Sequence, residues 1–268
     1  MDSGNDWRMT FRPDIPSPAR IYDFLLGGKD NYPADREVAQ ELLAAVPDVR
    51  VFAWQNRAFL RRAVRYMAGQ RGIRQFIDIG TGLPTEGNVH ELAQQAAPGA
   101  RVVCIDNDPV VLAHGRAMLH GVADTTIIEH DLRNPAAMLA DPDLGKLIDF
   151  GEPVGLLLVA VLHFVHDEDD PAGLVGQLVA ALPSGSLVAL SHATADSRPE
   201  SAKGERAYDR ATAQVHARTR DQVLAMAAGL DLVEPGLVWA PQWRPEPGTG
   251  PDPDPGRSHV YVAVGRKL

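Results

Sequence analysis

Five short apolar runs, separated by helical segments, organise the chain from residue 74 onward. The runs cover residues 75–79, 101–105, 125–129, 154–162 and 186–191. Three of the helical segments begin with an Asx-Pro pair, at Asp108, Asn134 and Asp170. The Asx side chain can cap free backbone N–H groups there, and proline is tolerated at the first helical position. Strands that alternate with helices predict a parallel sheet with helices on both faces.

Helical spacing also precedes the first apolar run. It covers residues 33–46 and 51–67. We predict that Arg57 and the other arginines of the second segment face solvent, as charged residues of a helix usually do. Because the strand pattern begins only after this part, we predict an N-terminal arm and helical lid over residues 1–70. Residues 71–268 are then expected to form one α/β domain.

Near the C-terminus the pattern changes. We predict helices over residues 199–216 and 220–229, followed by strands over residues 231–239 and 259–264. The loop between these strands, residues 241–256, contains six prolines, which exclude a helix. Strands joined without a crossover helix pair antiparallel. The sequence therefore predicts a Rossmann-like α/β fold with a seven-stranded, mostly parallel sheet that ends in an antiparallel strand.

Composition narrows the classes of partner. The 268 residues are 45% hydrophobic and carry a formal net charge of −9, which disfavours nucleic acid and anionic membranes as main partners. No apolar run reaches the roughly 20 residues of a membrane span, and residues 1–13 lack the apolar core of a signal peptide. The single cysteine, Cys104, excludes a disulfide framework. We expect a cytoplasmic protein.

Glycines and acids follow the predicted strands where a nucleotide-type cofactor would bind. The first run contains Asp78 near its end and leads into Gly80 and Gly82, whose lack of a side chain lets the backbone approach a ligand. Asp106 closes the second run, where a carboxylate can accept two ribose hydroxyl protons. Asp131 follows the third run and can accept from an adenine amino group. An acid at Asp78 suits a cationic ligand better than an anionic pyrophosphate, so we predict S-adenosylmethionine and keep a nicotinamide cofactor as the alternative.

Each part of this cofactor is assigned its own residues. The methionine half is assigned to Asp78, Gly80 and Gly82, the ribose to Asp106, and the adenine to Asp131 with the flanking Leu132; Asn107, next to Asp106, is also expected to bind the cofactor.

Two other enzyme classes lack their sequence markers. No tyrosine is followed four residues later by lysine, as the hydride chemistry of a short-chain dehydrogenase requires. The turn after the fourth run, residues 162–165, also lacks the Asn/Asp-Pro-Pro-aromatic motif of amino-methylating DNA enzymes. We therefore expect a small-molecule methyl acceptor and no nucleic acid.

The fourth run ends beside His163, which is the candidate catalytic residue. Methyl transfer depends mainly on alignment of the nucleophile, and a base is needed only if the acceptor must lose a proton. An imidazole suits that role, although His163 can equally line the adenosyl pocket. His163, His166, Asp167 and Glu168 could together bind a metal, but the acids adjoin a predicted helix N-terminus, which they favour electrostatically. We predict no metal.

The segment from Arg20 to Tyr32 is unusual because its double glycine is flanked by aromatic and charged residues. We hypothesise that it folds over the cofactor as a lid. Arg20 or Lys29 would then pair with the methionine carboxylate, and Tyr22 or Tyr32 would border the acceptor. The alternative is a helix C-cap at Gly27, followed by a surface turn.

The chain resembles an actinobacterial family of S-adenosylmethionine-dependent methyltransferases that was first catalogued as a domain of unknown function. The resemblance rests on residues 20–35, on Phe-Ile-Asp-Ile-Gly-Thr-Gly-Leu-Pro-Thr from residue 76, on residues 88–91, 103–112 and 156–163, and on the Pro235-Gly236 turn. It implies the class I methyltransferase fold and S-adenosylmethionine binding, and it supplies no substrate.

These observations predict an S-adenosylmethionine-dependent methyltransferase that acts on an oxygen, nitrogen or carboxylate of a metabolite. A non-catalytic protein that binds S-adenosylmethionine or S-adenosylhomocysteine and regulates a partner remains an alternative. A nicotinamide-dependent oxidoreductase is a further, weaker alternative. The sequence does not predict the oligomeric state.

Overall fold

A computed structural model describes residues 12–84, 87–194, 196–198 and 201–268. Its helices are α2 (Pro18–Leu26), α3 (Pro33–Ala45), α4 (Val49–Arg65), α5 (Val89–Ala96), α6 (Pro109–Met118), α7 (Pro135–Leu139), α8 (Pro142–Leu147), α9 (Pro171–Ala181), α10 (Ser201–Ala207) and α11 (Arg220–Met226). Its strands are β1 (Gln75–Ile79), β2 (Arg101–Asp106), β3 (Thr125–Glu129), β4 (Gly155–Val159), β5 (Leu187–Ala193), β6 (Leu230–Leu232), β7 (Val238–Trp239) and β8 (Val260–Lys267).

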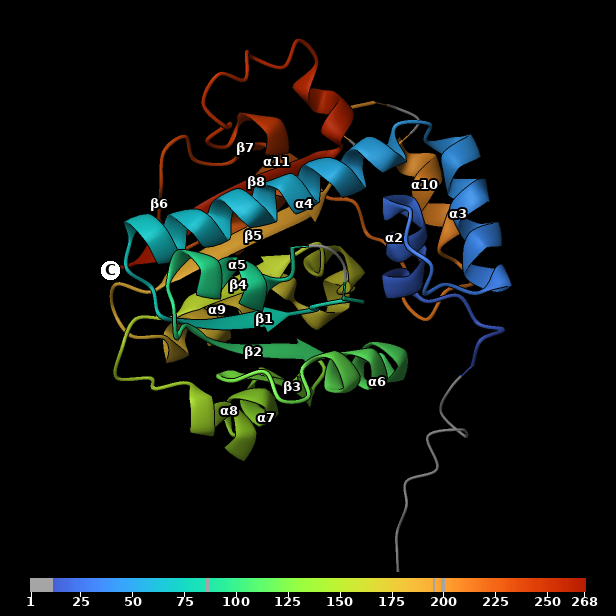
Figure 1. Ribbon diagram of the computed structural model, residues 1–268. Helices are drawn as coiled ribbons and strands as arrows, with labels where there is room; N and C mark the ends of the chain where they lie inside the picture. Colours follow the sequence, from blue (N-terminus) through green and yellow to red (C-terminus); the bar gives the residue numbers. More distant parts are fainter. Residues whose placement is uncertain (1–11, 85–86, 195, 199–200) are drawn as a thin grey trace, which may run out of the picture.

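One mixed sheet forms the centre of the protein (Figure 1). Its strand order is β3-β2-β1-β4-β5-β8-β6, and β7 pairs separately with β8. β1 to β5 are parallel, whereas β8 runs antiparallel to β5, β6 and β7. The chain order reverses between β1 and β4. In an open α/β sheet such a switch point, at the carboxyl ends of the strands, is where ligands bind.

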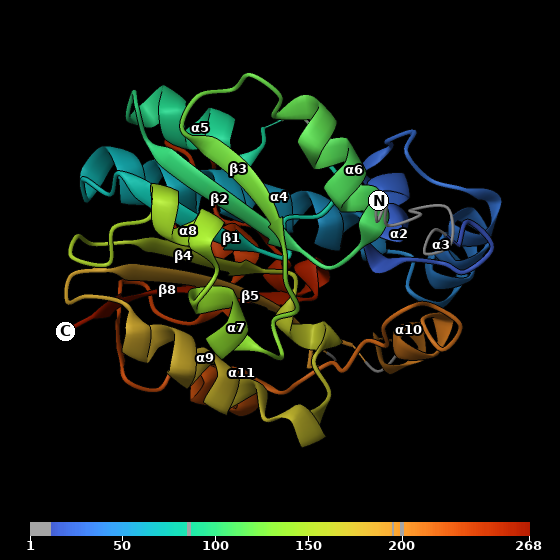
Figure 2. The same cartoon turned by 90° about the horizontal axis from the view of Figure 1, so that it is seen from below.

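Successive residues of each strand lie on opposite faces of the sheet, because side chains alternate along a strand. Phe76 packs with α4, α5 and α6 in one hydrophobic cluster, and the next residue, Ile77, packs with α7, α8, α9 and α11 in a second. Figure 2 shows α9 and α11 on the opposite side of the sheet from α5. The predicted helices on both faces are therefore confirmed.

A third hydrophobic cluster lies outside this sandwich. It joins α2, α3 and the start of α4 to α10, through residues such as Ile21, Val38, Leu42 and Ala207. Figure 1 shows α2, α3 and α10 grouped beyond the arrowheads of β1, β2 and β5. We call these three helices the cap. Because α4 continues from the cap cluster into the sheet cluster, it holds the cap at the carboxyl ends of the strands.

The structure confirms most predicted elements and corrects two. The run at 231–239 is split into β6 and β7, so in the described part of the chain the sheet has eight strands and not the predicted seven. The chain turns after Val233, where the N–H of Gly236, with a φ of 82°, donates to the Val233 carbonyl at 2.9 Å. Within the predicted helix 199–216, α10 ends at Ala207. The positions 199–200, like residues 1–11 of the predicted arm, lie outside the described residues.

Residues 208–219, which we call the strap, follow α10 where the sequence predicted that the helix would continue. The N–H groups of Thr212, His216 and Arg218 donate to the carbonyls of Pro16, His163 and Ala193, at 2.9, 2.8 and 3.3 Å. The strap therefore satisfies these backbone donors with neighbouring segments, which removes the need for helical hydrogen bonds. The domain boundary at residue 70 stays a prediction.

Candidate cofactor and acceptor site

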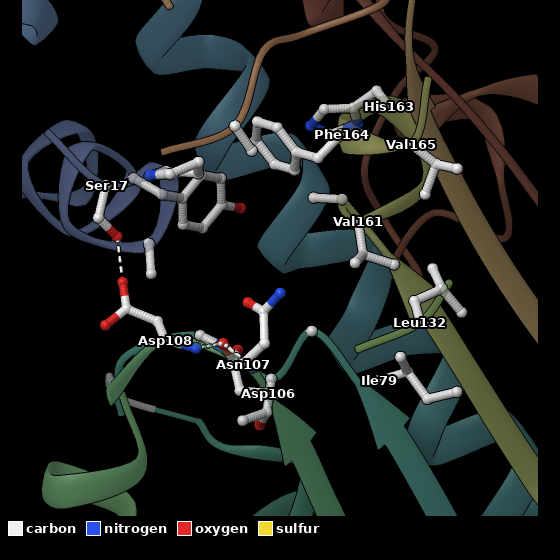
Figure 3. A pocket seen from close by; sticks show the side chains of 18 of the residues that line it. Ser17, Ile79, Asp106, Asn107, Asp108, Leu132, Val161, His163, Phe164 and Val165 are labelled. Carbon is white, nitrogen blue, oxygen red and sulfur yellow. Dashed lines mark hydrogen bonds between the residues drawn. The ribbon is translucent and has the colours of Figure 1, made fainter. Parts of the chain in front are cut away.

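A cavity of about 690 Å³ lies at the carboxyl ends of β1 to β4, within the range of roughly 300–1,000 Å³ typical of ligand sites. Sheet loops line one part, and α2, α4 and the strap line the other. Figure 3 shows Asp106 and Asn107 on one side of this space, Ile79, Leu132 and Val161 on a second, and His163 with Phe164 on a third. The cavity therefore combines a polar strand-end region with an aromatic region.

The end of β1 contributes a buried acid and two glycines. Burial raises the pKa of Asp78 to about 6, while a hydrogen bond from the Thr81 hydroxyl at 2.7 Å and the nearby Arg57 act in the opposite direction. Gly80 has a φ of +73°, and a Cβ there would lie 2.5 Å from Val161. Gly82 has a φ of +69° and open space around it. This turn leaves room for a ligand beside an acid that a cation would stabilise.

Asp106 ties the end of β2 to the glycine turn. Its carboxylate accepts from the backbone N–H groups of Gly82, Asn107 and Asp108, each at 2.9 Å. Burial raises the pKa of Asp106, and these backbone hydrogen bonds act against the rise. A carboxylate offers about four lone-pair positions, so the three backbone donors leave it capacity to accept from a ligand.

Asp131 occupies the neighbouring position after β3. The guanidinium of Arg133 donates to it and lowers the pKa of the Asp131 carboxyl, and Asn107 Nδ2 lies 3.3 Å from its Oδ2. Leu132 is buried beside it, and Figure 3 shows Leu132 close to Ile79 on the apolar wall. All seven residues predicted on the sheet side therefore line one cavity: Asp78, Gly80, Gly82, Asp106, Asn107, Asp131 and Leu132.

His163 lies at the far end of the cavity and is 4% exposed. Its ring packs edge-on against Phe52 and His192 and tilts against Phe164. The Ala193 N–H donates to His163 Nδ1 at 3.5 Å. Burial lowers the pKa of His163 well below its ordinary value, and His192, Arg218 and His216 lower it further. These surroundings therefore favour the neutral form of the ring.

The structure corrects the expectation for Arg20 and Lys29, since neither lines the cavity. Arg20 is buried in the cap, where its Nε lies 3.2 Å from Asp35 and its guanidinium donates to the Ile15 carbonyl. Lys29 is exposed. Gly27 caps α2 in the left-handed conformation, with a φ of 86°, which confirms the C-cap interpretation of the double glycine.

The cap nevertheless reaches the cavity through other residues. Tyr22 and Ser17 both line it, and the Ser17 hydroxyl donates to Asp108, as Figure 3 shows. This contact joins the start of α2 directly to the loop after β2. The predicted position of Tyr22 at the cavity wall is met, whereas Tyr32 is not among the lining residues.

Sequence reasoning missed two polar residues of α4. Asn56 is 2% exposed, accepts from Ser191 at 2.6 Å and donates to the Tyr22 hydroxyl at 2.9 Å. Arg57 lines the cavity instead of facing solvent, and burial lowers its pKa. The available signal was Asn56, which falls at helical spacing with Phe52 and Phe59 and thus places a polar residue on the apolar face.

Sequence reasoning also missed the strap. Its residues 208, 211–214 and 216 line the cavity, but the pattern there predicted a helix over most of the segment, and nothing in it indicated this position. Among the described residues, no group of three His, Cys, Asp or Glu side chains is arranged to hold a metal ion. Within the same parts of the chain, no helix is long and apolar enough to cross a membrane.

The parallel sheet with an antiparallel end, the glycine turn and the strand-end acids define a class I methyltransferase fold. Comparison with known proteins supports this assignment of the fold. The family model described as "S-adenosyl methyltransferase" matches residues 8–268, so the chain belongs to the S-adenosyl methyltransferase family. It is an S-adenosylmethionine-dependent methyltransferase, and the nicotinamide alternative is excluded.

Two similar solved structures come from actinobacteria. A protein of the DUF574 family from Streptomyces avermitilis is 40% identical, with a TM-score of 0.91 over 96% of this chain and 100% of that one. A methyltransferase candidate from Thermobifida fusca is 39% identical, with a TM-score of 0.90 over 95% and 96% of the two chains.

A more distant solved structure shares the fold alone. The N-methyltransferase NodS from Bradyrhizobium japonicum is 14% identical, with a TM-score of 0.50 over 81% of this chain and 96% of that one. The search of curated proteins found no match.

Proposed function

We propose that the protein methylates a small metabolite on an oxygen, a nitrogen or a carboxylate. The observation that carries this proposal is the single cavity shared by the strand ends and the cap. Tyr22, Phe52, Phe164 and Tyr208 line it around His163, and α2 and the strap cover it. A covered aromatic chamber suits a small organic acceptor better than a macromolecule.

The cofactor belongs, in this proposal, at the strand ends. Asp78 with Gly80 and Gly82 would hold the methionine half, because a buried acid stabilises a cationic ammonium or sulfonium. Asp106 would accept from the ribose hydroxyls. Asn107, Asp131 and Leu132 would contact the adenine, with Leu132 supplying part of an apolar wall.

Arg57 takes the role first assigned to Arg20 or Lys29. It lines the cavity from α4, close enough to Asp78 for each to affect the pKa of the other. The methionine carboxylate would pair with this guanidinium while the ammonium pairs with Asp78. The two ends of the amino acid would then meet charges of the opposite sign, as binding of a zwitterion requires.

Bound S-adenosylmethionine supplies an electrophilic methyl group on sulfur. The protein's contribution is to hold the acceptor in line and to exclude water, which lowers the entropic part of the barrier. The cap contacts at Ser17 and the strap contact at His216 close the cavity over this reaction.

Tritium-labelled methyl donor, the purified protein and an ultrafiltered metabolite extract test the proposal. We expect label in a small organic product, and none when Asp106→Ala replaces the wild type. A protein that binds S-adenosylhomocysteine in calorimetry but labels no small molecule would contradict the proposed reaction and favour the regulatory, non-catalytic alternative.

A further inference from the structure

The histidines of the acceptor end differ in which ring nitrogen carries the proton. A neutral imidazole has one N–H donor and one acceptor nitrogen, so a partner at one nitrogen fixes the role of the other. His163 Nδ1 accepts from the Ala193 N–H at 3.5 Å, and His166 Nδ1 accepts from the Glu168 N–H at 3.3 Å. Both rings therefore carry their proton on Nε2.

His192 has the opposite arrangement. Its Nδ1 lies 2.7 Å from the Ala193 carbonyl, to which it donates, and its Nε2 accepts from the Arg218 guanidinium at 3.0 Å. The same residue, Ala193, thus donates its N–H to one ring and offers its carbonyl to the other. The two tautomers are set by backbone groups whose roles cannot be exchanged.

His163 lines the cavity, and its Nδ1 is taken by the Ala193 N–H. Within the described residues this is the hydrogen bond of its ring, so the Nε2–H is left for a bound ligand. His166 lines the cavity as well, with its ring 4.7 Å from that of His216. The acceptor end therefore presents imidazole N–H donors to whatever binds there.

A general base at this position would have to become an imidazolium. Burial opposes a positive charge on His163, and so do the titratable groups packed around it: His192 from β5, and His216 and Arg218 from the strap. Phe52, from α4, adds an uncharged ring. The role of general base that the sequence suggested as one possibility for His163 therefore conflicts with its surroundings.

A nearby ion pair holds the loop that carries His163. The Arg218 side chain is 3% exposed, whereas its partner Asp167 is 71% exposed, with 2.6 Å between them. Arg218 does not line the cavity. Arg218 further donates to the carbonyls of Leu162 and Val165, which fixes the loop that carries His163.

We propose that His163, aided by His166, donates an Nε2–H hydrogen bond to an acceptor that enters as a carboxylate, so that the product is a methyl ester. This inference rests on the proposed function and names its substrate class. A carboxylate oxygen forms the new bond to the methyl carbon, and the electron pair of the broken carbon–sulfur bond stays on sulfur. The charges of carboxylate and sulfonium cancel, and no proton has to be removed.

The chemical stability of the labelled product tests the substrate class. A methyl ester releases volatile methanol in mild alkali, whereas methyl ethers and N-methyl groups do not. We expect the small labelled product to lose its label to the vapour phase. A base-stable small product would overturn this inference and leave the proposed function intact, while the absence of any small labelled product would overturn both.

Side-chain nitrogen NMR tests the tautomers without any reaction. In the full-length protein, with signals assigned by single histidine substitutions, His163 should show a neutral ring protonated on Nε2 across pH 5 to 8, the range in which an ordinary histidine titrates. His192 should show the neutral ring protonated on Nδ1. An imidazolium signal, or a proton on Nδ1 of His163, would contradict the proposal.

Two matched variants distinguish a hydrogen-bond donor at His163 from a general base. Gln places an amide N–H2 near the position of Nε2, and Asn places one near Nδ1; neither can act as a base. We expect His163→Gln to keep ester formation within about tenfold of wild type, and His163→Asn to lose at least a further tenfold. Equal losses in the two variants, with a wild-type pH profile that falls at low pH, would show a general base instead.

Discussion

The strand-end half of the cavity and the acceptor half are formed by different kinds of residue and by different segments of the chain. At the strand ends, residues close in sequence, such as Asp78 and Gly82, meet at the edge of a rigid sheet. The acceptor half collects α2, α4, the loop after β4 and the strap, which are distant in sequence. The first half offers acids and backbone groups, whereas the second offers neutral rings. The two ends of the cavity therefore depend on different segments of the chain.

Substitution in the glycine turn after β1 is expected to have the largest effect on stability and on cofactor binding. In Gly80→Ala the new Cβ would lie 2.5 Å from Val161, and the residue would also be held at a positive φ. Strain and overpacking together should lower the free energy of unfolding by about 2–4 kcal/mol. Denaturant titration measures this loss, and we expect S-adenosylhomocysteine binding to disappear.

Gly82→Ala is the matched control for that variant. Its φ is similarly positive, but a Cβ there meets open space, so only strain of about 1–2 kcal/mol is expected. The added methyl group would occupy cavity space and weaken cofactor binding. Equal destabilisation by the two substitutions would show that contact with Val161 is not the cause.

Asp78 tests the strand-end half of the cavity, because we expect its charge to lower the stability of the ligand-free protein and to strengthen cofactor binding. Its folded-state pKa, about 6, lies above the ordinary 3.8, so the folded protein binds more protons between these values and loses stability as pH rises through this window. Above pH 6, Asp78→Asn should stabilise the ligand-free protein by about 1–3 kcal/mol.

The same substitution should weaken S-adenosylmethionine binding by at least tenfold, because the cationic ligand loses its counter-charge. In the wild type, affinity should fall below pH 6, as the carboxyl becomes protonated. Thermal unfolding and calorimetry of the same preparations measure both effects. A destabilised Asp78→Asn variant would contradict the account of the buried acid.

Substitution of Arg57 is expected to have the smallest of these effects on cofactor binding. Arg57→Gln should weaken S-adenosylhomocysteine binding by about tenfold, or about 1.4 kcal/mol, which is close to the lower end of what one charge-assisted contact contributes. Arg65→Gln is the control: Arg65 belongs to the same helix, but its side chain is 50% exposed and pairs with Glu246. Equal affinities in the two variants would remove Arg57 from the cofactor site.

The strand-end half could be predicted from sequence because its residues follow directly from strand boundaries. A parallel sheet brings the carboxyl ends of β1, β2 and β3 to one edge, so Asp78, Asp106 and Asp131 must lie near one another once the strands are known. Their contacts could not be foreseen in detail. The three backbone donors to Asp106, for example, depend on the path of the turn after β1.

The acceptor half could not be predicted in the same way. Arg57 points into the cavity because α4 crosses from the cap to the sheet, and that crossing is a tertiary feature. Arg20 was expected at the cofactor because it lies in the segment hypothesised to be a lid, but Asp35 pairs with it inside the cap. The strap was predicted to be mostly helical, but its path follows backbone contacts to Pro16, His163 and Ala193, which are distant in sequence.

The most direct test of the central claim is a crystal structure of the protein with S-adenosylhomocysteine. We expect the ligand along the ends of β1 to β3, with ribose hydroxyl groups donating to Asp106 and the adenine beside Leu132. The sulfur should face the chamber that contains His163. Ligand density elsewhere, or Asp106 held only by its backbone partners beside a bound ligand, would contradict the account.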